Sequence, residues 1–427
     1  MIKTYNIRDL SVDEILAREE NAVDVSGIVA GVIDNVRKNG DAALAEYTEK
    51  FDKVKLESVV VTRAEIDEAA ASLDENFLQI LRDAAANIEH YHKCQIRQGY
   101  AVTDKEGVIL GQRVTPIEKV GVYVPGGSAP LPSSVLMNII PAKIAGVPFI
   151  AMATPPGPDG KVNPAILAAA DIAGADVIYK MGGSQAIAAL AYGTETVTAV
   201  HKIVGPGNAF VAEAKRQVFG KVGIDMIAGP SEIIVLADGT CDSTVVAADM
   251  LSQAEHDRLA SAILVTDSEE LAAKVADELE IQIPQLSRAD IARASIDVYG
   301  KIIITDTFAR AIDMVNELAP EHLEVMVDDP FAILPMIRNA GSIFLGKNCP
   351  EPLGDYFAGT NHVLPTSGTA KFSSPLSVDD YVKKSSYLYY TREALEKEAW
   401  RVNEFAKREQ LTAHARSAVV RFEKDGK

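Results

Sequence analysis

The sequence predicts an α/β protein with two incomplete Rossmann-like units, preceded by a helical segment and followed by a small helical tail. From about Val114, short apolar runs alternate with alanine-rich helical segments, as in parallel sheets flanked by helices. The length of 427 residues suits about two to three domains. With 48% apolar and 24% charged residues, the composition is that of an ordinary folded protein.

Residues 1–112 are expected to form a helical part that packs with the second α/β unit. Ser11 suits a helix N-cap, and Glu14, three residues later, completes a capping box. Apolar residues between Ala64 and Gln98 recur at helical spacing, with charged residues on the other side. This part is therefore predicted to be helical.

The first α/β unit is predicted over residues 113–230. Its apolar runs have the length of buried strands, and helical segments separate them. The Gly229–Pro230 pair is expected to be the hinge to the next unit. The runs are VGVYV (120–124), PFIAMAT (148–154), DVIYKM (176–181) and HKIVG (201–205).

The second α/β unit is predicted over residues 231–376, where the same alternation returns. Helical segments such as STVVAADMLSQAEH and SEELAAKVADEL lie between its apolar runs. The runs are EIIVLAD (232–238), AILVTD (262–267), KIIIT (301–305) and SIFLG (342–346).

Residues 377–427 differ from both units, because they are polar and rich in tyrosine and charge. The segment from Thr391 to Phe422 has a helical pattern. This tail is too small and too polar to form a hydrophobic core of its own. We expect it to bury its apolar face against another part of the chain or against another subunit.

Charge and cysteine content exclude several classes of protein. With 60 acidic and 42 basic residues the net charge is −18, which disfavours nucleic acid as a partner. No apolar stretch reaches the roughly 18 residues of a membrane span, and the N-terminus lacks a signal-peptide core. Cys94, Cys241 and Cys349 are isolated, which argues against a disulfide framework or a cysteine zinc site. A cytoplasmic protein is expected.

Three glycine-containing turns follow predicted strands of the first unit. Ligands of open α/β sheets bind at the carboxyl ends of strands, where helix N-termini present free N–H groups. Gly205 and Gly207 begin a dinucleotide-binding pattern, but Phe210 occupies its third glycine position. Each turn alone could be an ordinary tight turn; three in one sheet favour a dinucleotide or phosphate site. The turns are VYVPGG (122–127), KMGGSQ (180–185) and IVGPGNAF (203–210).

Asp249, Gln253 and His256 form the first group of candidate metal ligands. Offsets of four and three residues place them on one face of the predicted helix. A carboxylate, an amide and an imidazole there suit a metal, but they also suit a solvated helix face.

Two further groups contain a histidine and a carboxylate. Asp355 and His362 lie in the segment GDYFAGTNH, for which a capped loop is the alternative interpretation. Glu409 and His414 lie in the tail, for which an exposed helix face is the alternative. Catalytic zinc takes nitrogen and oxygen ligands and keeps a position for substrate. Asp355, His414 and the Gln253–His256 pair would supply four ligands only if the fold brings them together.

Glu321 and His322 are adjacent in LAPEHLEV, where Pro320 suits the first position of a new helical turn. Histidine is the usual general base near neutral pH, and a carboxylate can activate water. Adjacent helical residues do not face each other, so the two could address different atoms of one substrate. The alternative is a helix start with Glu321 complementing the dipole.

Together these segments resemble the histidinol dehydrogenase family over nearly the whole chain. Several independent motifs in the family's order make the resemblance more specific than any single loop. The motifs are VGVYVPGG, GGSQAIAALAYGT, KIVGPGN, IDMIAGPSE, DMLSQAEHD, LAPEHLE, GSIFLG, GDYFAGTNHVLPT and the E-x-x-x-x-H of the tail.

The resemblance implies roles for particular residues. Glu321 and His322 are implied to transfer protons, whereas Asp249 and His362 match no family ligand and are assigned structural roles. Zinc is implied at Gln253, His256, Asp355 and His414. The cofactor NAD is implied at Tyr123, Gln185 and Asn208. Substrate contacts are implied at Ser231, Gln253, His256, His322, Asp355, Glu409 and His414.

The implied activity is the NAD-dependent, four-electron oxidation of L-histidinol through L-histidinal to L-histidine, the final step of histidine biosynthesis. One zinc ion per subunit and a homodimer with exchanged C-terminal tails are also implied, although Mn or Co suits the same ligands. One alternative is a paralogue acting on another small polyol such as sulfopropanediol, against which the cation-binding carboxylate of Glu409 argues. A non-catalytic relative would have lost ligand or base positions, and all six are present.

Overall fold

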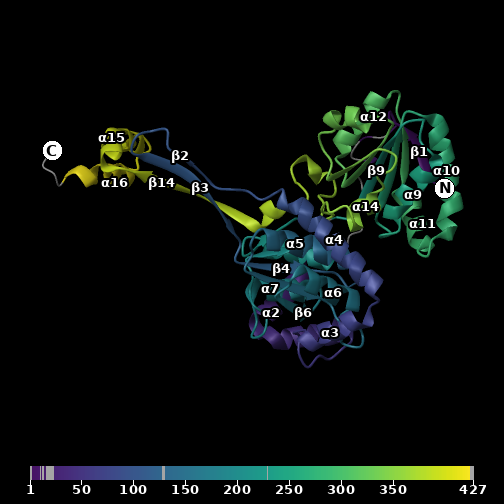
Figure 1. Cartoon of the computed structure of the whole chain (residues 1–427), viewed down its shortest axis with the longest axis horizontal. Coiled ribbons are helices and arrows are strands. Elements are labelled where there is room, and N and C mark those ends of the chain that lie inside the picture. The colour runs from purple at the N-terminus through teal and green to yellow at the C-terminus, as the bar shows by residue number, and fades with distance from the viewer. Residues whose placement is uncertain are drawn as a thin grey trace. The chain divides into compact units, whose positions relative to one another are not determined.

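The computed structural model divides the chain into two compact units (Figure 1). The first comprises Met1–Gln95 and Ile117–Tyr381, and the second comprises Ile96–Pro116 and Val382–Lys427. In the part of the chain that the structure describes, no helix is long and apolar enough to cross a membrane. The described residues are 2–9, 11, 14–15, 24–126, 130–227 and 229–423.

One sheet of the first unit has five parallel strands in the order β6-β5-β4-β7-β8. Because all the strands are parallel, their carboxyl ends meet at one edge of the sheet. The four predicted runs of residues 113–230 are confirmed as strands, and β8 was not predicted. The strands are β4 (Lys119–Tyr123), β5 (Phe149–Thr154), β6 (Val177–Lys180), β7 (Lys202–Val204) and β8 (Gly223–Ile224).

Helices cover both faces of this sheet. Alternate residues of β5 enter different cores: Ile150 and Met152 belong to one buried cluster, and Ala151 and Ala153 to the other. The first cluster includes residues of α3 to α6, and the second includes residues of α2, α7 and α8. The helices are α2 (Ser26–Tyr47), α3 (Arg63–Ser72), α4 (Glu75–Lys93), α5 (Pro132–Ile144), α6 (Pro164–Ala173), α7 (Gly183–Tyr192) and α8 (Ala209–Val218).

The N-terminal part packs differently from the expectation. Its helices α2, α3 and α4 pack on the five-stranded sheet, and only the strand β1 (Lys3–Asn6) joins the second sheet, beside β11. The capping box forms as predicted: the Ser11 N–H donates to Glu14 Oε2 (2.8 Å), and the Glu14 N–H donates to Ser11 Oγ (3.3 Å). Most of the helix predicted after Ser11 lies outside the described residues.

The second sheet of the first unit has six parallel strands in the order β1-β11-β10-β9-β12-β13. All four predicted runs of residues 231–376 are strands. The remaining strands are β9 (Glu232–Ala237), β10 (Ser261–Thr266), β11 (Lys301–Ile304), β12 (His322–Met326) and β13 (Ser342–Leu345). Its helices are α9 (Ser243–Ala254), α10 (Glu269–Gln282), α11 (Ala289–Val298), α12 (Phe308–Leu318), α13 (Pro330–Ile333) and α14 (Glu351–Tyr356).

The predicted helix start at Pro320 is wrong, because His322 begins the strand β12. Ala319 adopts a left-handed conformation (φ 50°) that ends α12, and the chain then extends between β9 and β13. Within the strand, Leu323 and Val325 face one buried cluster. His322 and Glu324 therefore point together to the opposite face of the sheet.

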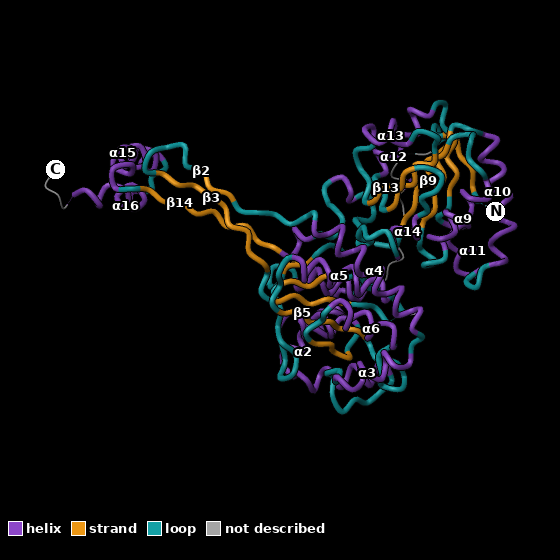
Figure 2. Tube along the Cα trace, viewed as in Figure 1, coloured by secondary structure: helices purple, strands orange, loops and turns teal. Residues whose placement is uncertain are grey.

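The second unit joins two distant segments of the sequence (Figure 2). Its antiparallel sheet has the order β14-β3-β2, and all nine residues of β14 pair with β3. The helical tail is confirmed as two helices, but the strand before them was not predicted. The elements are β2 (Tyr100–Val102), β3 (Val108–Pro116), β14 (Val382–Tyr390), α15 (Arg392–Arg408) and α16 (Thr412–Glu423). The boundaries at residues 112, 230 and 376 stay predictions.

Candidate active site

Glu321 and His322 lie at the start of β12, and both are buried. The backbone N–H and carbonyl of Glu232 on β9 orient the two side chains. Its N–H donates to Glu321 Oε2 (2.8 Å), and its carbonyl oxygen lies 2.9 Å from His322 Nδ1. Because a carbonyl oxygen only accepts, Nδ1 must carry a proton. Nε2 is therefore the atom of His322 that gains or loses a proton.

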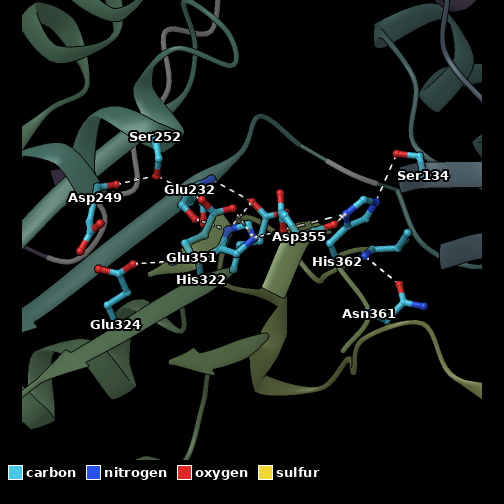
Figure 3. Close-up of polar contacts among 12 residues, drawn as sticks. Ser134, Glu232, Asp249, Ser252, His322, Glu324, Glu351, Asp355, Asn361 and His362 are labelled. Atoms are coloured by element: carbon cyan, nitrogen blue, oxygen red, sulfur yellow. Dashed lines mark hydrogen bonds and ion pairs between the residues drawn. The ribbon is translucent and has the colours of Figure 1, made fainter. Parts of the chain in front are cut away.

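Three carboxyl groups lie near the His322 ring, and Figure 3 labels two of them, Glu351 and Asp355. Nε2 lies 3.7 Å from Glu351 Oε1 and 3.7 Å from Asp355 Oδ1, while Nδ1 lies 3.6 Å from Glu321 Oε2. Among the described residues, His322 Nε2 and Glu351 Oε1 are buried without a hydrogen-bond partner. Buried polar atoms are normally satisfied, so these two atoms point to a missing ligand.

Burial and charge shift the titration of this cluster. Burial raises the pKa of Glu321 to about 8, although His322 and the Glu232 N–H oppose the shift. Burial alone would lower the pKa of His322, but the nearby carboxylates, first Glu321 and then Asp355, raise it to about 10. Burial would likewise raise the pKa of Asp355, yet His322 and His362 hold it well below its usual range. The site therefore has an excess of acidic groups, which favours a bound cation.

A second row of buried polar groups joins α9, β12 and α14. The Glu351 N–H donates to Glu324 Oε1 (2.7 Å), and Ser252 Oγ donates to Glu351 Oε2 (3.1 Å). Burial raises the pKa of both Asp249 and Glu324, which favours a proton on one of these two neighbouring carboxyl groups. Burial, with Asp249 beside it, raises the pKa of Glu324 to about 9. The structural role assigned to Asp249 stays a prediction.

Glu351 and Glu324 are site residues that sequence reasoning missed. Glu351 and Asp355 lie four residues apart on α14, which places them on one helix face. Glu324 follows His322 by two residues on a strand and so shares its face. Both signals were present in the sequence, but the second needed β12 to be recognised as a strand.

The residues present fit a metal ion. One ligand atom each from His322, Glu351 and Asp355 lies within 4.8 Å of the others. Of these three residues, only Asp355 is among the zinc ligands that the resemblance implies. Gln253 is 1% exposed, and within the described residues its Oε1 is buried without a hydrogen-bond partner. His256 lies two residues beyond the end of α9 and is exposed as a whole residue. The protein atoms around its imidazole nevertheless desolvate the ring and lower its pKa, and the nearby Asp355 carboxylate opposes this shift. Nitrogen and oxygen donors of this kind suit zinc.

The three glycine turns meet at the carboxyl edge of the five-stranded sheet. Tyr123 ends β4, and its hydroxyl accepts a hydrogen bond from the Gly183 N–H (3.1 Å) at the start of α7. A Cβ on Gly205 would lie 2.0 Å from the Tyr123 carbonyl oxygen, so only glycine allows this approach. Asn208 caps α8, and Gln185 is buried in the first turn of α7.

A cavity of about 590 Å³ opens at the same edge. Its volume lies in the range of small-molecule sites, roughly 300–1,000 Å³. It is lined by residues that follow β4 and β5, including Pro125, Gly126 and Pro155, and by Glu65 and Glu68 of α3.

Comparisons with known proteins agree on one family. A family model described as histidinol dehydrogenase matches residues 16–422. Histidinol dehydrogenase of Clostridium acetobutylicum is 57% identical over 404 residues, covering 95% of this chain and 94% of that protein. The chain belongs to the histidinol dehydrogenase family.

Further relatives agree. Histidinol dehydrogenase of Geobacillus kaustophilus is 58% identical over 396 residues, 93% of each chain. The crystal structure of histidinol dehydrogenase from Elizabethkingia anophelis matches with a TM-score of 0.94 and 38% identity, covering 100% of this chain and 99% of that one. The chain is thus an oxidoreductase of this family, and the alternative of a sulfopropanediol dehydrogenase is not supported.

The structure separates the residues to which the histidinol dehydrogenase resemblance assigns zinc and substrate. Gln253, His256 and Asp355 belong to the first unit, whereas His414 belongs to the second, where it is exposed on α16. Glu409 is also in the second unit, exposed at the end of α15. The first unit of one chain therefore contains three of the four predicted zinc ligands.

Ser231 and His362 also lie in the first unit. Ser231 is half-buried just before β9, where its carbonyl accepts from the Ser261 N–H (3.0 Å). His362 Nδ1 lies 3.0 Å from the Asp355 carbonyl oxygen, and its Nε2 lies 3.2 Å from Ser134 Oγ. Both ring nitrogens of His362 thus lie within hydrogen-bond distance of a partner, and its structural role stays a prediction.

Proposed function

We propose that this chain oxidises L-histidinol through L-histidinal to L-histidine, as the last step of histidine biosynthesis, with NAD and one zinc ion per subunit. The observation that carries the proposal is the buried Glu321–His322 pair, in which the backbone N–H and carbonyl of one residue of β9 orient two proton-transfer groups. A pair of this kind suits a reaction with two chemical steps, because one group can serve the alcohol and the other the water.

Zinc is assigned to Gln253, His256, Asp355 and His414. The unpartnered Gln253 oxygen and the acidic surroundings of Asp355 support this assignment. When bound, zinc supplies a fixed point that orients the amino and imidazole nitrogens of the substrate. Mn and Co suit the same nitrogen and oxygen donors.

NAD is assigned to Tyr123, Gln185 and Asn208. Their glycine turns meet at one sheet edge, and the cavity of about 590 Å³ beside β4 and β5 offers room for the rest of a dinucleotide. NAD supplies a hydride acceptor for each of the two oxidations.

The acid–base pair has separate duties. In its neutral form, His322 takes the hydroxyl proton of the alcohol at Nε2, because Nδ1 is held by the Glu232 carbonyl. A cation bound beside Asp355 would offset the carboxylates that raise the pKa of His322, and so would favour this neutral form. Glu321, as the carboxylate, takes a proton from the water that adds to the aldehyde. His322 then assists the second oxidation. Both groups are buried, which protects the aldehyde from bulk water.

A homodimer with exchanged tails would complete this site. The second unit leaves large apolar side chains exposed, including Leu388 (70%), Trp400 (59%) and Phe405 (70%). Such a surface is typical of an interface. We assign His414 to the zinc site, and Glu409 to the substrate site, of the partner subunit. Glu409 would attract the cationic substrate.

Product analysis tests the proposed activity. The purified protein with zinc is incubated with L-histidinol and NAD, and the products are identified by mass spectrometry. We expect L-histidine as the end product. Accumulation of L-histidinal, or unchanged L-histidinol, would contradict the proposal.

A further inference from the structure

Lys215 and Asp225 form a buried ion pair whose partners both contact Gly205. Their side chains are 3% and 1% exposed. Lys215 Nζ donates to the Gly205 carbonyl oxygen (2.9 Å), and the Gly205 N–H donates to Asp225 Oδ2 (2.8 Å). The two charged groups thus hold both polar groups of one backbone residue.

Gly205 is the point where two glycine turns touch. Its φ of 110° suits glycine, and its Cα faces the Tyr123 carbonyl oxygen at a distance that excludes a Cβ. Three residues later, Asn208 caps α8 through hydrogen bonds from the N–H groups of Phe210 (3.1 Å) and Val211 (3.2 Å). The position of Gly205 therefore sets the course of the turn that leads from β7 to Asn208.

Stability alone does not account for this pair. Desolvating two ions costs several kcal/mol each, and apolar side chains of similar size often serve a core equally well. Apolar side chains could not, however, bond both the N–H and the carbonyl of Gly205. The ion pair supplies a donor and an acceptor at fixed places, which is what a precisely positioned loop requires.

We propose that Lys215 and Asp225 are positioning residues for the dinucleotide: they hold Gly205 against Tyr123 and so fix the turn that presents Asn208. The inference rests on the proposed function, because it takes NAD as the ligand of these turns. Neither side chain needs to contact the cofactor.

The double variant Lys215→Met/Asp225→Asn tests this role. It removes both charges together, so no unpaired ion is left in the core, and the amide oxygen introduced by Asp225→Asn would still accept from the Gly205 N–H. Only the donor to the Gly205 carbonyl is lost. We expect KM for NAD and Kd for NADH to rise roughly tenfold, as loop misplacement does. KM for histidinol should stay within about twofold of wild type.

Lys202→Met is the matched control. Lys202 is also largely buried and pairs with Asp380 through the carboxylate (3.2 Å) and the carbonyl (2.7 Å), but Asp380 belongs to no glycine turn. We expect this variant to lower the melting temperature without changing KM for NAD. If it raises KM for NAD as much as the double variant does, the specific role of the Gly205 contacts is disproved.

The wild-type protein separates the two ways in which the account can fail. If wild type neither binds NADH nor reduces NAD with histidinol, the proposed cofactor is wrong, and the inference is wrong with it. If wild type binds NADH and the folded double variant binds it equally well, only the positioning role is wrong. Should the double variant not fold, Lys215→Met alone, which also removes the donor to the Gly205 carbonyl oxygen, is measured instead; an unchanged ratio of the KM values for NAD and histidinol would then disprove the positioning role.

Discussion

Backbone groups, rather than other side chains, hold the two proton-transfer residues in place. Glu321 accepts from the Glu232 N–H, and Nδ1 of His322 donates to the Glu232 carbonyl oxygen. A substitution that preserves these hydrogen bonds therefore removes the proton chemistry with little change of geometry. Such substitutions can separate the two oxidations.

Glu321→Gln and His322→Asn should affect different steps. Gln keeps an acceptor for the Glu232 N–H but cannot take a proton, so oxidation of L-histidinal should slow by about 10²-fold or more, with a smaller effect on the alcohol. His322→Asn should slow alcohol oxidation by a similar factor. Stopped-flow measurement of NADH from each substrate distinguishes the steps; equal loss of both in Glu321→Gln would contradict a water-activating role.

Gln253 should contribute to metal affinity through its unpartnered oxygen. Gln253→Leu removes that donor, and we expect zinc affinity to fall by roughly 10- to 100-fold, measured by competition with a chelator. Asn138→Leu is a matched control, because Asn138 Oδ1 is another amide oxygen that is buried without a partner among the described residues. Equal loss of zinc affinity in both variants would show that the effect comes from the fold rather than from a ligand.

Individual site residues could be predicted only where the signal is local. Helical spacing correctly predicted that Asp249 and Gln253 lie on one helix. The same spacing predicted that this helix continues to His256, but α9 ends at Ala254. The contacts that define the site join β9, β12 and α14, whose mutual placement depends on strand order. Glu351 was missed for this reason, because its importance comes from a histidine 29 positions earlier in the chain.

At the scale of elements, strands with continuous apolar runs were predictable and strands with polar residues were not. The eight predicted runs of the two sheets are all strands. In β12, His322 and Glu324 interrupt the apolar pattern because they face the site. In β14, most residues are exposed, since within the described residues it pairs only with β3 and packs against α15. Strand β12 was therefore missed because its site residues are polar, and β14 was missed because most of its residues face solvent.

The turn between α15 and α16 holds Gln410 in a left-handed backbone conformation that is unfavourable for residues other than glycine. Gln410 has a φ of 62°, and its N–H donates to the Lys407 carbonyl oxygen (3.0 Å) in a helix-ending turn that favours glycine. Gln410→Gly should raise the free energy of unfolding by about 1 kcal/mol. Gln79→Gly, on the exposed face of α4, should lower it by about 1 kcal/mol. Urea denaturation measures both, and a loss of stability in Gln410→Gly would refute the turn assignment.

At the scale of the whole molecule, the predicted zinc ligands are divided between two compact units. The exposed apolar surface of the second unit and the position of His414 on it motivate the exchanged homodimer. Sequence could indicate that the tail lacks a core. It could not indicate that residues 96–116 accompany the tail, because β3 and β14 pair across more than 260 residues of chain.

Mixing two inactive variants tests the exchange. His322→Asn alters the first unit, and His414→Asn alters the second. If tails are exchanged, a mixed dimer has one site with both changes and one site with neither, so co-refolding should restore activity to about a quarter of the wild-type level. Each variant refolded alone is the control. Without exchange every subunit carries a defect, and no activity returns.

Electron stoichiometry tests the central claim most directly. Purified protein is given limiting L-histidinol and excess NAD, and the NADH formed per histidinol is counted from its absorbance. Two successive oxidations by the Glu321–His322 pair predict two NADH per histidinol. One NADH per histidinol would contradict the second oxidation and would mean that the protein is a simple alcohol dehydrogenase. No NADH would contradict the proposed reaction as a whole.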